Sequence, residues 1–177
     1  MHRLFLGLRP PGAIRARLLS LMGGIPGARW QEDDQLHVTV RFIGAVDRPA
    51  AEDAVAAIDA LRLPAAEAAL CGTGAFDTRG RLNSVWAGLS PREPLERLHR
   101  KVDQALARMG LEPERRAYLP HITLARLNAP PEAAAAFLAA HAALASDPFA
   151  FDRLILFESR LGHGAARYEP VADWPLG

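Results

Sequence analysis

Two pairs of side chains in this chain have the types and the spacing needed for acid–base chemistry. His37 lies two positions before Thr39, and His121 lies two positions before Thr123. Side chains alternate between the two faces of a β-strand, so in a strand each histidine shares a face with its threonine, while the apolar residues between and after them point to the core. Each half of the chain therefore presents one imidazole beside one hydroxyl.

Chance explains this recurrence poorly. The chain has only six histidines and four threonines, so composition produces two such pairs by accident about one time in a hundred. The alternative is that all four are ordinary strand residues, since threonine favours strands and a lone histidine on a sheet usually has no special role. The apolar residue that closes both segments favours a shared function.

Two imidazoles and two hydroxyls that meet in a cleft suit the cleavage of a cyclic phosphodiester. A neutral imidazole can take a proton from an attacking water, and an imidazolium can protonate the departing oxygen. An unperturbed histidine pKa of about 6.5 lets both states coexist near neutral pH. Threonine hydroxyls can donate hydrogen bonds to the non-bridging oxygens, where negative charge accumulates in the transition state.

The rest of the chain must supply the scaffold for these residues. Its 177 residues, 50% of them hydrophobic, are enough for one domain with a substantial core. The single Cys71 excludes an internal disulfide, the N-terminal apolar run is too short for a secretory signal, and the alanine-rich stretch 133–145 is too short to span a bilayer. We expect a cytoplasmic protein without a membrane segment.

The charge balance bears on the class of ligand. With 21 basic and 20 acidic residues the formal net charge is +1, which argues against a protein that holds long nucleic acid by neutralising many phosphates. It does not argue against recognition of a single end. The acidic cluster Glu32, Asp33 and Asp34 has no second cluster or suitably spaced histidine, so a solvated loop is favoured over a metal site.

Hydrophobic periodicity and helix or strand breakers predict alternating strands and helices. Strands are expected at 3–8, 36–44, 65–73, 83–89, 118–126, 149–156 and a last segment that ends near residue 168. Helices are expected at 13–22, 47–61, 91–109 and after the proline pair 130–131. The two halves match in this order and their motifs are offset by 84 positions, which suggests a duplication and a pseudo-two-fold cleft.

Some local features carry predictions of their own. Ser90 and Glu93 have the spacing of a capping box at the start of the third helix, and His99, at the edge of that helix's apolar stripe, is assigned to the surface. The glycine-rich segment 72–81 is expected to connect the two halves, and Cys71 to act as a small apolar residue.

At this level of detail the chain resembles a known family, the 2H phosphoesterases, which are named for two H-x-T-x motifs. Within it, the chain looks most like the RNA 2',3'-cyclic phosphodiesterases, also called 2'-5' RNA ligases. Two motifs in this order and context are much more specific than one. The matching segments cover almost the whole chain and comprise residues 3–5, Trp30, 36–44, 85–88, 118–126, Ser159, Gly164, Tyr168 and 174–176.

The resemblance implies a fold and an activity. The fold is α+β, a single bilobed domain over residues 1–177, with two pseudo-symmetric lobes whose antiparallel sheets line a central cleft and whose helices pack outside. The activity is metal-independent hydrolysis of RNA 2',3'-cyclic phosphate ends to 2'-phosphomonoester ends, and reversible 2'-5' ligation by the same chemistry is allowed. The expected partners are RNA 3' ends that carry the cyclic phosphate, or nucleoside 2',3'-cyclic phosphates, with no cofactor and no obligate protein partner.

Roles follow from the resemblance residue by residue. His37 is the implied proton donor and His121 the acceptor, while Thr39 and Thr123 bind the phosphate. Arg126 matches the arginine that contacts phosphate in the family. Strict alternation would place Arg126 on the core face, where an arginine cannot remain unpaired, so the strand must end or bulge before it.

Aromatic residues near the motifs have two interpretations. Phe5 shares a face with the first motif if its strand lies alongside, and it either stacks on a base or packs under a helix. Tyr118 is likewise a candidate substrate-binding residue. Phe42 and Trp86 are expected to serve in packing.

Two other classes of function compete with the enzyme. A zinc site built on His37 and His121 lacks further ligands and gives the threonines no purpose. A non-catalytic RNA-end binding protein or ligation accessory that uses the same cleft is harder to separate from an enzyme. Turnover of a ribonucleoside 2',3'-cyclic phosphate would distinguish the two.

Overall fold

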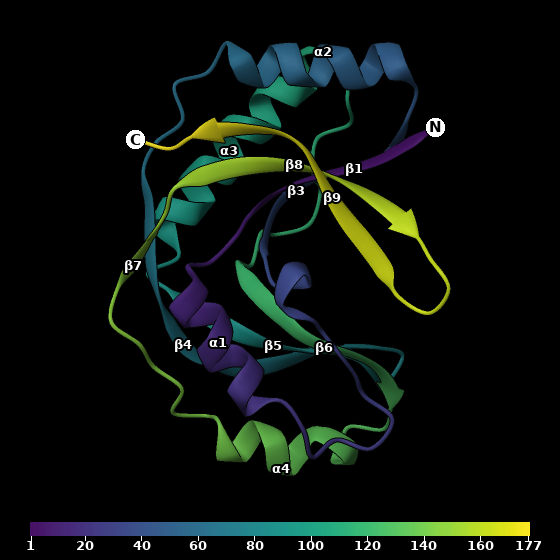
Figure 1. Cartoon of the computed structure of the whole chain (residues 1–177), viewed down its shortest axis with the longest axis vertical. Coiled ribbons are helices and arrows are strands. Elements are labelled where there is room, and N and C mark those ends of the chain that lie inside the picture. The colour runs from purple at the N-terminus through teal and green to yellow at the C-terminus, as the bar shows by residue number, and fades with distance from the viewer.

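The computed structural model describes residues 1–177 and contains four α-helices, one short 3-10 helix and nine strands (Figure 1). The strands are β1 (His2–Leu8), β2 (Arg29–Trp30), β3 (Val38–Val46), β4 (Ala66–Thr78), β5 (Arg81–Ser90), β6 (His121–Ala129), β7 (Phe149–Phe151), β8 (Arg153–Leu161) and β9 (Ala166–Pro175). The helices are α1 (Gly12–Leu21), η1 (Asp33–Gln35), α2 (Arg48–Asp59), α3 (Glu93–Arg108) and α4 (Glu132–Ala140).

All strand pairs are antiparallel, and the two motif strands meet at the centre of the sheet. The strand order is β7-β4-β5-β6-β3-β1-β8-β9, with β2 added against β6. β3 and β6 pair only at Val38 and Ile122, the residues that directly follow the two motif histidines. This narrow junction divides the sheet into two lobes, which diverge in Figure 1 with helices outside them. The expected α+β fold of two lobes is confirmed.

Each lobe is built from both halves of the chain. One lobe contains β1, β3, β8 and β9, and the other contains β2, β4, β5, β6 and β7. Thus β4, which follows the first motif strand and α2, pairs with β5 in the lobe of the second motif. In return, β8 pairs with β1, so that Leu4 lies opposite Glu158.

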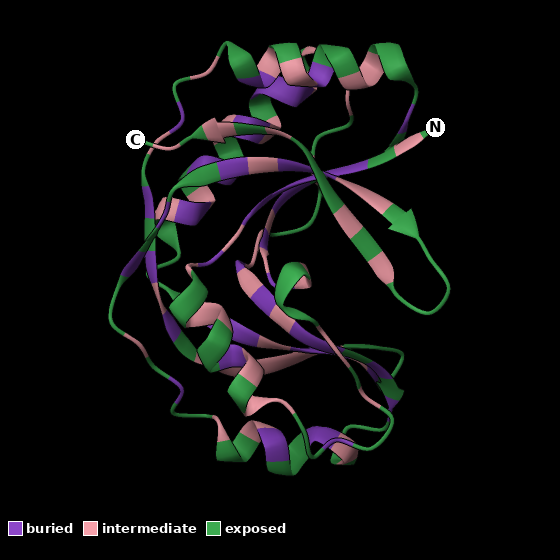
Figure 2. Ribbon diagram, viewed as in Figure 1, coloured by how far each residue is buried: buried purple, intermediate pink, exposed green.

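Helices bury their apolar sides against the outer faces of the lobes. α3 has the clearest stripe, with Leu95, Leu98, Val102 and Leu106 all at 0% exposure. A core of 35 buried apolar residues runs through the strands and these helix faces, as the purple segments of Figure 2 show. None of the helices, including α3, the longest at 16 residues, is long and apolar enough to cross a membrane.

Three local predictions were wrong. The glycine-rich segment 72–81 is largely strand, because β4 runs to Thr78 and only Arg79-Gly80 form the turn to β5. Gly74 permits this, since a Cβ there would come within 2.4 Å of the Trp86 indole on β5. Cys71 is exposed rather than buried. The capping box does not form, because Ser90 belongs to β5 and Arg92 is the N-cap residue of α3, without a side-chain cap.

The segment 25–35 contains more structure than a loop. It forms β2, which pairs with β6, and then the 3-10 turn η1, in which Glu32 and Gln35 cap each other. Asp33 forms an ion pair with Arg15 at 3.0 Å. This short segment leads directly into the first motif strand.

Candidate active site

Both motif strands contain a bulge at the fourth motif position. Along β6 the pairing with β5 passes from Thr123 opposite Trp86 to Ala125 opposite Val85, so Leu124 is the extra residue. The alternation of side chains is thereby reversed after Leu124, and Arg126 is exposed. The predicted bulge before Arg126 is confirmed, and it returns this guanidinium to the face that carries His121 and Thr123.

The first motif has the same irregularity. Along β3 the pairing with β1 passes from Thr39 opposite Gly7 to Arg41 opposite Leu6, so Val40 is the extra residue. Arg41 therefore turns inward and is buried, while Phe42 turns outward and is 57% exposed. Phe42 was expected to serve in packing, and its ring does lie 6.0 Å from that of Phe5, but the bulge places it on the exposed face that carries His37 and Thr39, in the position that corresponds to Arg126.

The two histidine rings are held in the same way. His37 Nδ1 lies 2.6 Å from the carbonyl oxygen of Gln35, and His121 Nδ1 lies 2.7 Å from that of Leu119. A carbonyl oxygen can only accept, so each Nδ1 carries the hydrogen and each Nε2 is left for the cleft. His37 Nε2 is 3.1 Å from Thr39 Oγ1, which donates to it while the ring is neutral.

Aromatic rings surround both imidazoles. His37 lies 5.0 Å from the Phe5 ring and 5.3 Å from the Tyr168 ring, the latter edge-on. His121 lies 4.9 Å from Phe76, also edge-on, and 5.8 Å from Trp86. Such packing restricts rotation of the imidazoles, and it removes part of their hydration.

Burial lowers the pKa of both histidines. For His37 the removal of water is the largest cause, the positive charges of Arg126, His121 and Arg9 add to it, and the pKa falls from 6.5 to about 4. For His121 burial is again the largest cause and the charge of Arg126 adds to it, so the pKa is lowered although the hydrogen bond to the Leu119 carbonyl acts in the opposite direction. Both rings are therefore neutral at pH 7 before a ligand binds.

Two predicted substrate-binding residues lie in supporting positions instead. Phe5 is only 4% exposed and packs on Phe157 with ring centroids 5.1 Å apart, so it has no free face for a base. Tyr118 donates its hydroxyl hydrogen to the Thr39 carbonyl at 2.8 Å and stacks on His99. His99 was expected at the surface but is 8% exposed, because it reaches into the core side of the first motif.

Arg9 is a site residue that the sequence reasoning missed. It directly follows β1, its guanidinium lies 5.6 Å from the centre of the Phe157 ring, and its charge acts on His37. Its Nε is buried without a hydrogen-bond partner in the protein. The only available signal was a lone arginine at the end of a leucine-rich strand, which does not by itself indicate a ligand.

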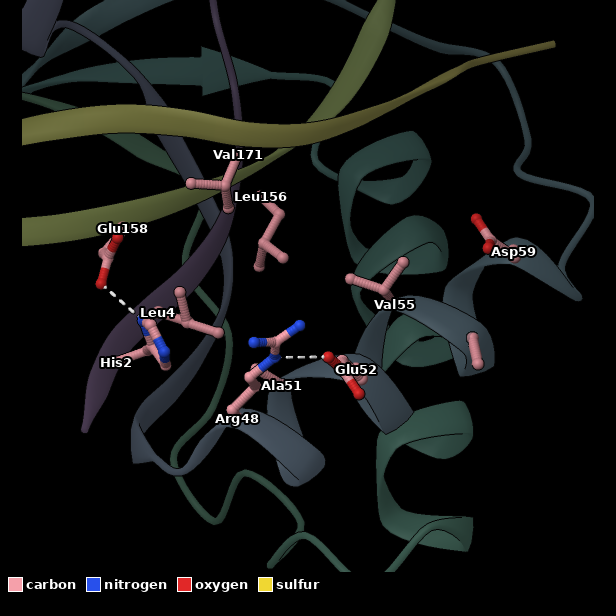
Figure 3. A pocket seen from close by; sticks show the side chains of 11 residues that line it. His2, Leu4, Arg48, Ala51, Glu52, Val55, Asp59, Leu156, Glu158 and Val171 are labelled. Atoms are coloured by element: carbon pink, nitrogen blue, oxygen red, sulfur yellow. Dashed lines mark hydrogen bonds and ion pairs between the residues drawn. The ribbon is translucent and has the colours of Figure 1, made fainter.

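Two cavities lie near these elements, and only one borders the site. A cavity of about 320 Å³ is lined by Trp86 and Gly88, which flank His121 across the β5–β6 pair, and by Arg92. A second cavity of about 430 Å³ lies between α2 and the outer face of β1 and β8 (Figure 3). Leu156 lines that cavity whereas its neighbour Phe157 packs toward His37, so the second cavity is on the opposite side of the sheet from the motifs.

The structure contains no group of three or more His, Cys, Asp and Glu side chains arranged to hold a metal ion. The ionisable and polar groups that it does bring together are the ones that suit phosphate. They are His37, Thr39, His121, Thr123 and Arg126, to which Arg9 is added.

Comparison with known proteins identifies relatives in sequence and in structure. A family model described as the 2'-5' RNA ligase superfamily matches residues 4–163. An RNA 2',3'-cyclic phosphodiesterase of Aeropyrum pernix is 35% identical over 106 residues, which are 59% of this chain and 60% of that protein. One of Geobacillus stearothermophilus is 32% identical over 161 residues, or 86% of this chain and 49% of that protein. The matched segments thus span less than two thirds of either relative.

Solved structures agree on the fold. E. coli LigT complexed with 3'-AMP superposes with a TM-score of 0.80 at 25% identity, covering 99% of this chain and 98% of LigT. A protein of Thermus thermophilus gives the same TM-score at 23% identity, covering 98% and 97% of the two chains. With the paired motifs, the bulges and the family match in agreement, the chain belongs to the 2'-5' RNA ligase superfamily of 2H phosphoesterases.

Proposed function

We propose that this protein hydrolyses RNA 2',3'-cyclic phosphate ends to 2'-phosphomonoester ends by acid–base catalysis from two histidines. One observation carries the proposal: His37 and His121 lie next to the junction of the two lobes, and each is fixed through Nδ1 to a backbone carbonyl, which leaves Nε2 without a hydrogen; that of His37 accepts a hydrogen bond from Thr39. The names of the curated relatives support the substrate class.

The proton path has a donor and an acceptor. Neutral His121 removes a proton from water as the water oxygen bonds to phosphorus, and protonated His37 gives a proton to O3' as the P–O3' bond breaks. The products are a 2'-phosphate and a free 3'-hydroxyl, and proton exchange with solvent resets both rings. With a ribose 5'-hydroxyl in place of water, the same ring opening would form a P–O5' bond as the P–O3' bond breaks, which gives a 2'-5' linkage and a free 3'-hydroxyl.

Positive charge prepares the site for the phosphate. Arg126 and Arg9 both act electrostatically on His37, so an anion bound among them experiences a favourable potential. The Thr39 hydroxyl and its counterpart on Thr123 can donate to the non-bridging oxygens, where charge grows in the transition state. Bound phosphate in turn raises the pKa of His37, which favours the protonated form that the donor role requires.

Phe42 gives the site an apolar platform. Its ring is exposed on the cleft face, five positions after His37, where the second motif has Arg126 instead. A base can stack on such a ring without sequence preference. The asymmetry assigns base binding to the Phe42 side and phosphate binding to the Arg126 side.

A single assay tests the reaction. An oligoribonucleotide that ends in a 2',3'-cyclic phosphate, incubated with the protein and EDTA, should be converted to a 2'-phosphate end at the same rate as without EDTA. Because His37 is the proton donor, the bond to O3' is the one that breaks. A mainly 3'-phosphate product would show that the assigned roles of the two histidines must be exchanged. Loss of turnover with EDTA, and its recovery with a divalent ion, would contradict metal independence.

The pH dependence of the rate should differ between free and substrate-bound protein. Activity requires neutral His121, so it is lost as pH falls, and protonated His37, so it is lost as pH rises. The pKa of each ring in the free protein lies below 6.5, so above that pH His37 has lost its proton and kcat/KM should fall as the pH rises. In the pH profile of kcat, the alkaline limb should lie at higher pH than in the profile of kcat/KM, because bound phosphate raises the pKa of His37. Coincident alkaline limbs would show that phosphate does not act on this histidine.

A further inference from the structure

The bulge in the second motif is held by backbone. A bulge interrupts the hydrogen-bond ladder, so its carbonyl groups must find partners elsewhere. The carbonyl of Leu124 accepts a hydrogen bond of 2.8 Å from the backbone N–H of Gln31, which follows β2. β2 itself pairs with the residues just beyond the bulge, Ala125 and Arg126.

The equivalent bulge in the first motif is held by side chains. His99 Nδ1 lies 2.7 Å from the carbonyl oxygen of Val40, the bulge residue, and the Tyr118 hydroxyl donates to the carbonyl oxygen of Thr39 at 2.8 Å. Two consecutive carbonyl groups of the motif strand are thus satisfied from outside the sheet. His99 and Tyr118 thus bind the carbonyl groups at the bulge of β3, whereas β2 and the residue after it hold the bulge of β6.

The two supporting side chains form a rigid pair. Their rings stack with centroids 4.2 Å apart and planes within 6° of parallel. A carbonyl accepts only, so His99 Nδ1 carries the hydrogen of its bond to Val40. Burial raises the pKa of the Tyr118 hydroxyl, which therefore remains a donor at any working pH.

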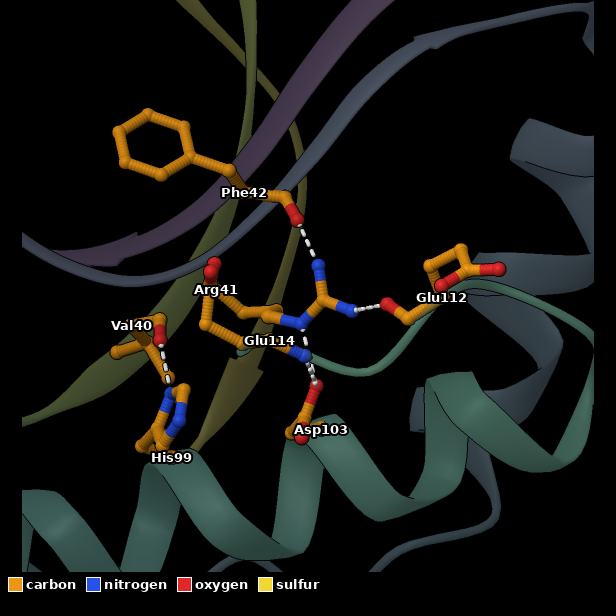
Figure 4. Close-up of polar contacts among 7 residues, drawn as sticks. All are labelled: Val40, Arg41, Phe42, His99, Asp103, Glu112 and Glu114. Carbon is orange, nitrogen blue, oxygen red and sulfur yellow. Dashed lines mark hydrogen bonds and ion pairs between the residues drawn. The ribbon is translucent and has the colours of Figure 1, made fainter. Parts of the chain in front are cut away.

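α3 anchors this pair to the rest of the first motif. His99 and Asp103 are one turn apart on the same face of α3, and Figure 4 shows both pointing at β3. Asp103 binds Arg41 Nε at 2.6 Å and the backbone N–H of Glu114 at 3.1 Å. Arg41 also donates to the carbonyls of Phe42 and Glu112 (Figure 4). The helix therefore holds both Val40 and the residue after it.

Tyr118 links the two motifs directly. It lies three residues before His121 in the segment that leads into β6, yet its hydroxyl is bound to the carbonyl of Thr39 on β3. Thr39 in turn donates to His37 Nε2. A shift of Tyr118 or of the Thr39 carbonyl would therefore move the first histidine and its threonine relative to the second.

We propose that His99 and Tyr118 are positioning residues that set the angle of Thr39 and His37 with respect to His121. The proposal rests on the proposed function, because it assigns no chemistry to either residue and acts only through His37 and Thr39. The pair holds carbonyl groups on the core side of the strand and takes no part in binding the phosphate.

Three variants separate the hydrogen bonds from the ring stack. Tyr118→Phe and His99→Phe each keep an aromatic ring in the stack and remove one donor. His99→Asn removes the ring but keeps an amide N–H near the position of Nδ1. Val102→Ala, on the same buried face of α3 and without a side-chain hydrogen-bonding group, is the matched control for loss of stability without loss of these bonds.

Hydrolysis of a ribonucleoside 2',3'-cyclic phosphate is then measured per folded molecule, with melting temperature followed in parallel. Tyr118→Phe and His99→Phe should each lower kcat by about 10-fold to 100-fold, as expected for a small misplacement of a catalytic group. KM should change little, because the phosphate donors remain. His99→Asn should recover a large part of the kcat that His99→Phe loses, and Val102→Ala should melt earlier but retain wild-type kcat.

The outcomes distinguish this inference from the proposed function. If His37→Ala abolishes turnover but both phenylalanine variants keep wild-type kcat, the positioning role is refuted and the proposed function stands. If His99→Asn is no better than His99→Phe, or if Val102→Ala loses kcat equally, the pair contributes only to stability. If wild-type protein does not turn over the cyclic phosphate, the proposed function itself fails.

Discussion

Replacing His37 or His121 by alanine should lower the rate of cyclic phosphate hydrolysis by at least about 10² and by as much as about 10⁴, the range of effects for a positioned general acid or base. Each ring is fixed through Nδ1 by a backbone carbonyl, which leaves Nε2 as the nitrogen for proton transfer, so the alanine substitution removes the general acid or base itself. Steady-state kinetics on a ribonucleoside 2',3'-cyclic phosphate measure the effect.

The two losses should not multiply in the double variant, since both histidines act on one transition state. His163→Ala, in an exposed turn between β8 and β9, is the matched control and should behave as wild type. Circular dichroism and thermal melting should show that both active-site variants remain folded. A folded His37→Ala or His121→Ala protein with near wild-type turnover would refute the two-histidine mechanism.

Replacing Arg126 by methionine should lower kcat/KM by about 10² or more, comparable to the loss of one preorganised donor to a developing oxyanion. It should also raise the pKa of both histidines, because the Arg126 charge lowers the pKa of each. Both limbs of the kcat/KM profile should therefore move to higher pH. A pH–rate titration of the variant against wild type measures both effects.

Arg81→Met is the control for this experiment. Arg81 lies on β5 in the same lobe and is exposed, and it is bound to Asn128 rather than directed at the motifs. Its loss removes the same charge from the same lobe, and it should leave rate and pH profile unchanged. If Arg126→Met matches Arg81→Met, the guanidinium does not contact the phosphate.

A site residue could be placed from the sequence where the deciding pattern lay within a few neighbouring residues. Alternation over three residues was enough to place each histidine beside its threonine. Arg126 was placed correctly because an unpaired buried arginine is too costly, which forced a bulge into the prediction. The equivalent bulge in the first motif could not be predicted in this way. Strict alternation places Arg41 on the outer face and Phe42 on the core face, an arrangement that leaves no buried charge unpaired. An alignment of the two motifs, residue by residue, would have placed Phe42 correctly, because Phe42 occupies the position of Arg126.

Contacts between distant segments explain the remaining errors. His99 was assigned to the surface from its helix stripe alone, but its partner is a carbonyl 59 residues earlier in the chain. The glycines of β4 were interpreted as a connection between the two halves, whereas Gly74 makes room for an indole from the next strand. Nothing in the local pattern distinguishes a glycine that bends the chain from one that admits a neighbour.

The exchange of strands between lobes constrains how the chain can be synthesised and folded. Neither lobe is encoded by a continuous stretch, since β1 pairs with β8, more than a hundred residues later, and β6 pairs with β2, which precedes the first motif strand. On the ribosome, the lobe of the first motif cannot complete its sheet until nearly the whole polypeptide has emerged, because strands that pair across long separations must wait for each other. The nascent chain therefore carries an unpaired edge of β1 through most of its synthesis, and the last strands to be made are the ones that close it.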